Sequence, residues 1–260
     1  MTLLGTGTST GVPVIGCGCR VCTSADPRDA RMRCAAHVVA ETEHGPVHLQ
    51  IDIGPDFRQQ ALRFGVSRVD ALLFTHHHFD HVVGLDDLRP FFFGNRAAVP
   101  AYASPVTAGV LREMFRYIFE RTYPGASVLD LHEAAGPFTV PSRYDAEAAV
   151  TVEPLEAFHG DLPVLGYRVG RFAYLTDVNR IPEATFEKLV ALDVLVLDGL
   201  RREPHPTHFT FDEAVAAARR IGARQTYFIH MTHGALHAEI DAELPDGIAL
   251  GYDGLTFSVE

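Results

Sequence analysis

Residues that can bind metal ions are crowded into residues 76–81, whose sequence is HHHFDH. In an extended segment the side chains at positions i and i+2 point to the same side, so His76 and His78 can hold one ion. Asp80 and His81 come from the next turn and can hold a second ion nearby. Imidazole and carboxylate ligands suit zinc or manganese. A histidine-rich surface tract is the alternative, and the spacing and the preceding apolar run argue against it.

Three of the four cysteines, Cys17, Cys19 and Cys22, lie within six residues of one another. In a cytosolic protein such crowding is typical of metal binding rather than of disulfides. A redox-active or merely buried group of thiols is the alternative. The remaining cysteine, Cys34, is isolated in the sequence, and we expect it to be buried.

Several apolar runs of strand character end abruptly at a histidine or an aspartate. These ends are Asp52, the cluster after Thr75, His159, Asp177, Asp198 and His230. Sheet proteins gather a site at one edge by placing polar residues at the ends of buried strands. The repetition of this pattern predicts that these side chains converge.

Helices are expected between the strands. One opens with a capping box at residues 210–213 and stops at Gly222. Others are predicted at residues 182–191, where a proline occupies the first turn, and at residues 105–119. Residues 90–141 form the least regular stretch, and we interpret them as a lid or an insertion beside the site.

The chain has 260 residues, of which 47% are hydrophobic, and it shows no linker, so we expect a single domain over residues 1–260. The formal net charge is -11, Lys188 is the only lysine, and basic residues do not cluster. Long nucleic acid is therefore a poor candidate partner. A small anionic substrate stays open, because bound divalent cations would reverse the local sign of the field.

The first residues carry neither a basic start nor an apolar run of signal-peptide length. No apolar run approaches the length of a membrane span, so we expect no membrane partner and a cytoplasmic location. The sequence leaves a homodimer open.

Residues 75–81 resemble the H-x-H-x-D-H motif of the metallo-β-lactamase superfamily. The resemblance implies an α/β fold, the αββα sandwich, in which two mixed β-sheets pack face to face with helices outside. It also implies a dimetal centre, in which His159 completes the first metal site, Asp177 bridges both ions and His230 completes the second site. The full set of implied ligands is His76, His78, Asp80, His81, His159, Asp177 and His230.

A closer resemblance is to the phosphoribosyl cyclic phosphate phosphodiesterases of the carbon–phosphorus lyase pathway. It is carried by residues 5–9, 11–13, 17–22, 84–85, 166–167, 207–209, 230–233 and 252–254. In that family three cysteines and a histidine hold a structural zinc ion, and the matching residues here are Cys17, Cys19, Cys22 and His233. Three thiolates and one imidazole would close a tetrahedral zinc site without an open position.

The resemblance implies a phosphodiesterase that hydrolyses a small cyclic diester, either phosphoribosyl or nucleotide-like. Two divalent ions, Mn²⁺ or Zn²⁺, can lower the pKa of water and stabilise charge on phosphoryl oxygens. His208 resembles the family's general acid, which would protonate the leaving oxygen, and Asp80 would assist proton transfer. Arg31, Arg33 and Arg89 are candidate contacts for the phosphate.

Three other functions compete with this hypothesis. A tRNA 3′-processing endoribonuclease of the same fold normally carries a basic arm, and the sequence shows none. Non-heme iron oxidoreductases such as the persulfide dioxygenases share the H-x-H-x-D-H motif, and protein B of pyrroloquinoline quinone biosynthesis shares the cysteine–zinc site. A non-catalytic metal-binding module would not need the complete ligand set. Iron content with oxygen consumption would identify an oxidoreductase, whereas diester cleavage would identify a hydrolase.

Overall fold

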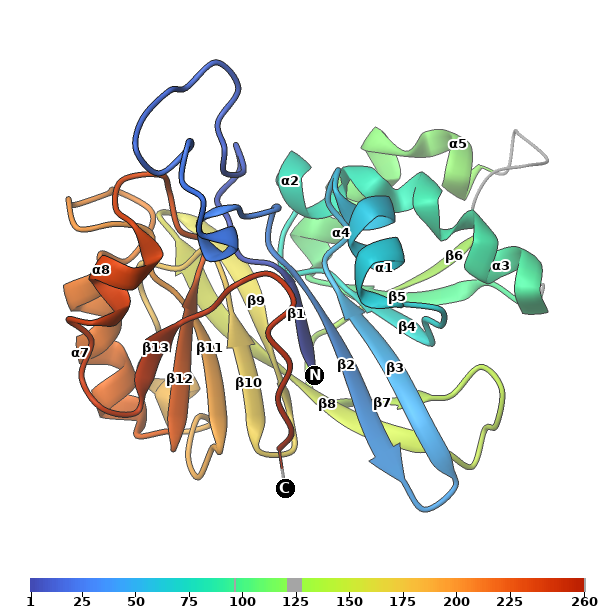
Figure 1. The fold of residues 1–260 in the computed structure, drawn as a ribbon. Coiled ribbons are helices and arrows are strands. Elements are labelled where there is room, and N and C mark those ends of the chain that lie inside the picture. Colours follow the sequence, from blue (N-terminus) through green and yellow to red (C-terminus); the bar gives the residue numbers. More distant parts are fainter. Residues whose placement is uncertain (96, 121–127, 260) are drawn as a thin grey trace.

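Two β-sheets pack face to face in the computed structural model, which describes residues 1–95, 97–120 and 128–259 (Figure 1). The first sheet runs in the order β1 (Thr2–Gly5), β2 (Ala35–Thr42), β3 (Gly45–Ile51), β4 (Ala71–Leu73), β5 (Val99–Ala103) and β6 (Leu129–Glu133). The second runs in the order β13 (Ile248–Leu250), β12 (Gln225–Ile229), β11 (Val194–Asp198), β10 (Phe172–Leu175), β9 (Leu162–Val169), β8 (Ala149–His159) and β7 (Phe138–Pro141).

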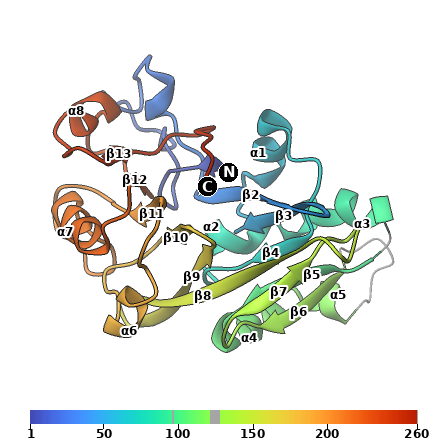
Figure 2. The same cartoon turned by 90° about the horizontal axis from the view of Figure 1, so that it is seen from below.

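Helices cover the outer faces of both sheets (Figure 2). Beside the first sheet lie α1 (Phe57–Phe64), α2 (Phe79–Val82), α3 (Arg89–Asn95), α4 (Pro105–Met114) and α5 (Arg116–Phe119). Beside the second lie α6 (Glu183–Phe186), α7 (Phe211–Ile221) and α8 (His237–Asp241), and short 3₁₀ helices span Pro27–Asp29 and Val83–Leu88. The sheets contain both parallel and antiparallel pairs, so the predicted αββα sandwich is confirmed.

Parallel pairing places the functional ends of the strands at one edge of the sandwich. Strands β3 to β6 are parallel to one another, and so are β10 to β13. Because parallel strands end on the same side, the residues that follow β3, β4, β10, β11 and β12 gather there. The six strands expected from the apolar runs are all present, and each ends within three residues of its predicted polar residue.

The space between the sheets is filled by apolar side chains that alternate along the strands. Tyr167 and Tyr174 are fully buried in this layer. The hydroxyl of Tyr167 donates to the carbonyl oxygen of Phe74 at 2.6 Å, which ties β9 to the end of β4. This contact joins the two sheets directly beneath the histidine-rich segment.

The helix predicted at residues 210–220 is confirmed as α7. Thr210 and Glu213 form the reciprocal capping box, and Gly222 ends the helix with a left-handed conformation. The predicted helix at residues 182–191 is much shorter, because only α6 is helical and the chain then turns to Ala191, which has a φ of 56°.

The predicted helix at residues 105–119 is divided into α4 and α5. The backbone leaves the helical region at Phe115, with φ -117° and ψ 41°. The Phe115 side chain is buried in the core beneath the helices, and this burial favours a break over a continuous helix that would carry the ring elsewhere.

The interpretation of residues 90–141 as an irregular lid or insertion is wrong for most of this stretch. Strands β5 and β6 complete the first sheet, and β7 pairs with β8 in the second. Residues 96 and 121–127 lie outside the described residues. These strands have only four or five residues, and β5 and β7 each contain a proline, which concealed their pattern in the sequence.

Among the described residues, no helix is both long and apolar enough to cross a membrane. The single domain, the cytoplasmic location and the homodimer stay predictions.

Candidate metal centre

The segment after β4 brings two imidazoles together with a third from β8. The ring centroids of His76 and His78 are 4.5 Å apart, and His159 lies 5.7 Å from the first and 5.1 Å from the second. The ligand atoms of these three residues all lie within 4.8 Å of one another. The structure therefore brings the predicted ligands of the first metal site to one place.

A second group forms where α2 meets the end of β12. Asp80 and His81 belong to α2, and His230 follows the last residue of β12. Their ligand atoms also lie within 4.8 Å of one another, with 3.2 Å between His81 Nε2 and Asp80 Oδ2. This group contains the ligands predicted for the second metal site.

Asp177 lies between the two groups. Its Oδ1 atom is 4.0 Å from His76 Nε2 and 3.1 Å from His230 Nε2, and its Oδ2 atom is 3.2 Å from His81 Nε2. A carboxylate in this position can reach two ions at once, which is the arrangement expected of a bridging ligand.

The donor set fits divalent cations. His76 Nε2 is buried without a hydrogen-bond partner, and such an atom is costly unless something binds it. Burial lowers the pKa of His76 well below its usual range, so the ring is neutral and keeps a free electron pair. Although burial alone would raise the pKa of Asp177, the neighbouring His230 and His81 hold it well below its usual range, so the carboxylate stays anionic.

Asp52, at the end of β3, orients one of these imidazoles. This fully buried side chain accepts hydrogen bonds from the backbone N–H and the hydroxyl of Thr75, at 2.9 and 2.8 Å. It also accepts from His81 Nδ1 at 2.7 Å. Because Nδ1 carries the proton in this bond, Nε2 keeps its electron pair for a metal ion on the side toward Asp177. The strand-end pattern identified Asp52, but it gave no sign of this role.

Asp198 orients His208 in a similar way. Its carboxylate accepts from His208 Nδ1 at 2.8 Å and from the backbone N–H of Val178 at 2.9 Å. His208 is 7% exposed, and its Nε2 atom lies 4.0 Å from Asp177 Oδ1. The ligand atoms of His159, Asp177 and His208 also fall within 4.8 Å, so His208 is placed either to bind an ion or to transfer a proton.

The backbone takes an unusual conformation where the strands deliver their ligands. Asp52, Asp177 and His230 have φ values of 56°, 56° and 66°, in the left-handed region that residues with a Cβ rarely adopt. Each such residue costs about 1–3 kcal/mol and persists only where the surrounding structure fixes it. The sharp turn at each strand end aims the side chain into the site.

Two glycines allow α2 to pack against the loop after β3. A Cβ atom on Gly54 would lie 1.9 Å from the carbonyl oxygen of Asp80, and one on Gly84 would lie 2.3 Å from that of Gly54. No side chain fits in either place. The two backbones are therefore in direct contact, and α2 is fixed relative to Asp52.

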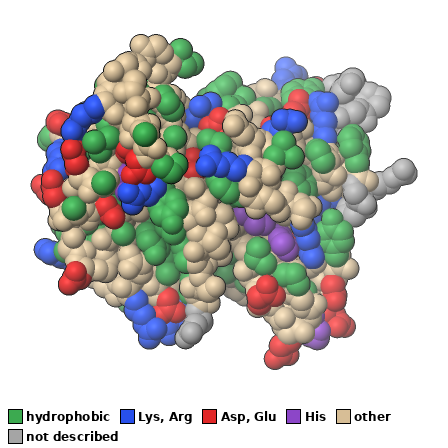
Figure 3. All heavy atoms as spheres, viewed as in Figure 1, with side chains coloured by type: hydrophobic (Ala, Val, Ile, Leu, Met, Phe, Trp, Pro, Cys, Tyr) green, Lys and Arg blue, Asp and Glu red, His purple; other side chains and the backbone are tan. Residues whose placement is uncertain are grey.

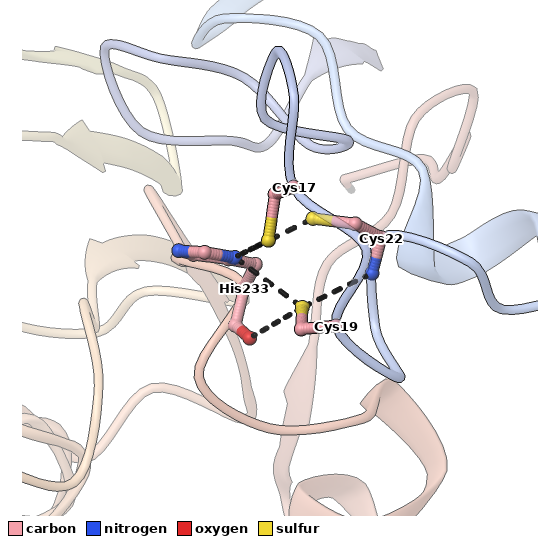
Figure 4. Close-up of side chains that lie close together, drawn as sticks. All are labelled: Cys17, Cys19, Cys22 and His233. Carbon is pink, nitrogen blue, oxygen red and sulfur yellow. Dashed lines mark hydrogen bonds between the residues drawn. The ribbon is translucent and has the colours of Figure 1, made fainter.

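The cysteine cluster has the shape of a closed metal site (Figure 4). The sulfur atoms of Cys17, Cys19 and Cys22 each lie 3.4 Å from Nδ1 of His233. A tetrahedral zinc ion with ordinary bond lengths would separate sulfur and nitrogen ligands by about 3.6 Å. The hydrogen bond from the Cys22 backbone N–H lowers the pKa of Cys19 to about 6, which favours the thiolate form that binds metals. Cys34 is buried elsewhere.

The segment from His230 to His233 connects the two clusters. Met231, between them, donates its N–H to the carbonyl oxygen of Thr6 and accepts at its own carbonyl oxygen from the N–H of Thr8, both at 3.1 Å. The loop that carries the cysteines thus begins beside a ligand of the histidine-rich cluster.

Arg31 does not bind phosphate as the sequence suggested. It is 5% exposed, and its guanidinium group donates to Thr6 Oγ1 and to the Gly251 carbonyl oxygen, both at 2.8 Å. Arg33 and Arg89 are paired with the carboxylates of acidic neighbours, Asp56 and Asp86.

Comparison with known sequences gives two kinds of relative. Residues 48–231 match the family model of the beta-lactamase superfamily domain. An octanoyltransferase of Porphyromonas gingivalis is 44% identical over 258 residues, which are 97% of this chain and 50% of that protein. The chain therefore spans half the length of this relative. Coenzyme PQQ synthesis protein B of Methylorubrum extorquens is 27% identical over 226 residues, covering 76% of this chain and 72% of that protein.

Solved structures extend the comparison. A diphosphatase from the PhnP family is 41% identical, with a TM-score of 0.87, and covers 99% of this chain and 97% of its own. Zinc-bound PqqB from Methylobacterium extorquens, at 19% identity and a TM-score of 0.76, covers 99% of both chains. The short form of human tRNase Z, at 18% identity and a TM-score of 0.67, covers 100% of this chain and 98% of its own. The last two share the fold.

Proposed function

The chain belongs to the beta-lactamase superfamily and, within it, to the PhnP family, and on that premise we propose that it hydrolyses a small phosphodiester. It is a metal-dependent hydrolase. The observation that carries the proposal is the convergence of the histidine and aspartate side chains around Asp177 at the ends of the strands.

Two divalent ions, manganese or zinc, would occupy this centre. Their ligands would be His76, His78 and His159 for one ion and Asp80, His81 and His230 for the other, with Asp177 shared between them. When bound, such ions supply Lewis acidity that acidifies water and offsets negative charge on phosphoryl oxygens.

His208 would act as the general acid. Asp198 accepts a hydrogen bond from His208 Nδ1 and would stabilise the charged imidazolium, and Nε2 lies on the side of the ring toward Asp177. A proton from Nε2 would neutralise the leaving oxygen, because an alkoxide leaves poorly without one. Asp80, which lies with His81 and His230, would assist proton transfer.

The substrate would be a small cyclic diester rather than a polymer. The formal charge of -11 with a single lysine does not favour a long phosphate backbone. On the face drawn in Figure 3, basic side chains are interspersed with acidic ones. A tRNA substrate rests on tRNase Z structures that share only the fold, and an iron oxidoreductase rests only on the shared motif.

A diphosphate is the second candidate substrate, because the 41% identical relative is a diphosphatase. In a diphosphate that links two organic groups, one oxygen bridges the two phosphorus atoms. Attack of water on one phosphorus would displace this bridging oxygen together with the other phosphate. The same water-activating and acid groups would serve both reactions.

Cys17, Cys19, Cys22 and His233 would hold a structural zinc ion. Four protein ligands fill a tetrahedral shell, so this ion would have no open position for substrate. Its contribution would be to the folding of the loop after β1.

Hydrolysis of a panel of substrates tests the proposal. Cyclic and linear phosphodiesters and linked diphosphates would be assayed with added Mn²⁺ and Zn²⁺, alongside elemental analysis of protein purified without chelator. We expect about three ions per chain and cleavage of at least one cyclic diester or diphosphate. Full activity with one ion per chain would contradict the dimetal centre, and oxygen consumption with bound iron would favour the oxidoreductase.

A further inference from the structure

The side-chain amide of Asn179 links two loops at the edge of the site. Its Oδ1 atom accepts from the N–H of Gly160 at 2.9 Å, and its Nδ2 atom donates to the carbonyl oxygen of Pro206 at 2.8 Å. One partner is a donor and the other an acceptor, so the residue between them must offer both functions. Asn179 itself lies in a third segment, which follows β10. The three joined segments carry side chains of the proposed centre, namely His159, Asp177 and His208.

The loop that carries His208 is tied down on both sides of that residue. After it, the N–H of Phe209 donates to the carbonyl oxygen of Val178 at 2.9 Å. Before it, the carbonyl oxygen of Pro206 accepts from the Asn179 amide. His208 is therefore placed relative to residues 178 and 179, which directly follow the proposed bridging carboxylate in the chain.

The loop after β8 packs closely against the His208 loop. Nδ1 of His159 donates to the carbonyl oxygen of Thr207 at 2.9 Å. A Cβ atom on Gly160 would lie 2.9 Å from Cγ2 of Thr207, and Gly160 has a φ of 64°, so no side chain fits between the two loops. Because the contact leaves no space, displacement of one loop would move the other.

We propose that Asn179 is a positioning residue for the general acid, because its bond to Pro206 holds the loop where His208 can reach the leaving oxygen. The inference rests on the proposed function. Asp198 accepts from Nδ1 of His208 and so fixes which ring nitrogen is free, but the place of the loop backbone depends on other contacts. A general acid must lie about 2.6–3.2 Å from the atom that it protonates. A misplacement of about 1 Å can cost about 10²-fold in rate.

Paired substrates test this role. In saturating Mn²⁺, Asn179→Ala should lower kcat for a diester with an alkoxide leaving group by about 10- to 100-fold, with KM little changed. Bis-nitrophenyl phosphate should be affected much less, because its phenolate leaves without a proton. Asn179→Asp should match Asn179→Ala, since a carboxylate still accepts from Gly160 but cannot donate to Pro206. A tether that only stabilised the fold would slow both substrates alike.

Thr185→Val is the matched control. The Thr185 hydroxyl donates to the carbonyl oxygen of Glu156 at 2.7 Å, so it also ties a neighbouring segment to the chain around β8, but not to the His208 loop. This variant should lower the Tm without changing the ratio of the two rates.

A double-mutant cycle asks whether Asn179 acts through His208. With His208→Ala in place, Asn179→Ala should cause no further loss on the alkoxide diester, because the acid that it positions is gone. Losses that multiply, or equal losses on both substrates in the single variant, would overturn the inference. If Asn179→Ala does not fold, Asn179→Asp keeps the bond to Gly160 and serves for the same cycle.

A proton signal gives a readout that does not depend on turnover. The Nδ1 proton of His208, held by Asp198, should give a slowly exchanging NMR signal that His208→Ala removes. Asn179→Ala should broaden or abolish this signal, and Thr185→Val should not. An unchanged signal in Asn179→Ala would contradict the positioning role. A wild-type protein that cleaves no phosphodiester, while its His208 signal still depends on Asn179, would refute the proposed function and leave the positioning contact standing.

Discussion

Three buried aspartates face the site from strand ends in both sheets: Asp52 follows β3, Asp177 comes after β10 and Asp198 ends β11. The Asp177 carboxylate lies within 4.0 Å of four imidazole Nε2 atoms, whereas Asp52 and Asp198 accept hydrogen bonds from the Nδ1 atoms of His81 and His208. The same residue type thus acts on the two sides of an imidazole ring. One side would bind the ion, and the other fixes which nitrogen is free to do so.

Replacing Asp177 tests its proposed position between two ions. Asp177→Ala should lower metal content and reduce activity at least about 100-fold, because both groups lose a shared negative ligand. Elemental analysis and hydrolysis would be measured on the same preparation. Lost activity with both ions retained at full occupancy would show that Asp177 does not bridge them.

Replacing His208 separates an acid from a ligand. His208→Ala should slow a diester with an alkoxide leaving group by about 10²–10⁴-fold with metal content unchanged. Bis-nitrophenyl phosphate should be affected much less, because its phenolate leaves without a proton. His205→Ala is the control, since His205 lies 5.0 Å from the His208 ring and is half-buried. Equal losses on the two substrates would assign His208 to binding instead.

The proposed ligands could be named from the sequence because each lies at or soon after the end of an apolar run and because the resemblance to the metallo-β-lactamase superfamily singles them out. The roles of Asp52 and Asp198 could not, because a hydrogen bond to Nδ1 depends on a partner 29 or 10 residues away in the chain. The prediction that Arg31 contacts phosphate failed for a related reason, because its neighbours in the sequence do not reveal that it is buried.

At the scale of elements, the one-turn helix α2 is positioned by glycine rather than by side-chain packing. The Asp80 carbonyl oxygen of α2 touches the loop after β3 at Gly54, and Gly84 in the 3₁₀ helix that follows touches the same loop. A helix of one turn has little stability of its own, so these contacts and the metal centre must hold it.

Adding one methyl group at Gly54 should disturb α2. Gly54→Ala should reduce activity about 10- to 100-fold and weaken metal binding by Asp80, because its Cβ atom would overlap the Asp80 carbonyl oxygen. Gly109→Ala is the matched control, since its Cβ atom would meet nothing within 4 Å in α4, and it should raise stability by about 0.5–1 kcal/mol. Wild-type activity and metal content in Gly54→Ala would mean that α2 adjusts freely.

Elements with strong local signals were predictable, and those decided by packing were not. The capping box at Thr210 and the stop at Gly222 fix α7 locally. By contrast, the break at Phe115 depends on a core that the sequence does not display, and β5 to β7 depend on neighbouring strands far away in the chain.

At the scale of the whole molecule, the cysteine loop joins the two ends of the chain. Its three cysteines lie between residues 17 and 22, and their imidazole partner is His233. Met231, two residues before His233, forms backbone hydrogen bonds with Thr6 and Thr8. A metal ion there would cross-link segments more than 200 residues apart, and the unfolded chain would lose that constraint.

Loss of this cross-link should lower the thermal stability of the protein before it affects catalysis. Cys19→Ser should remove one ion per chain and lower the Tm by about 5 °C or more, with activity declining as the protein unfolds. Calorimetry and elemental analysis would be compared with the wild type. An unchanged Tm together with unchanged zinc content would remove the structural role of the cluster.

The left-handed backbone at Asp52, Asp177 and His230 lowers the stability of the fold, but it positions side chains that catalysis needs. Selection for stability and selection for activity therefore oppose each other at these three positions. Glycine at any of these positions would relax the chain and erase the side chain that faces the site. Ala191 has the same left-handed conformation on a turn outside the site. Glycine there would relieve the backbone strain without removing a side chain of the site. A lineage under demand for heat resistance would therefore find its improvements at such turns, while the three strand ends stay fixed in every descendant that still turns over substrate.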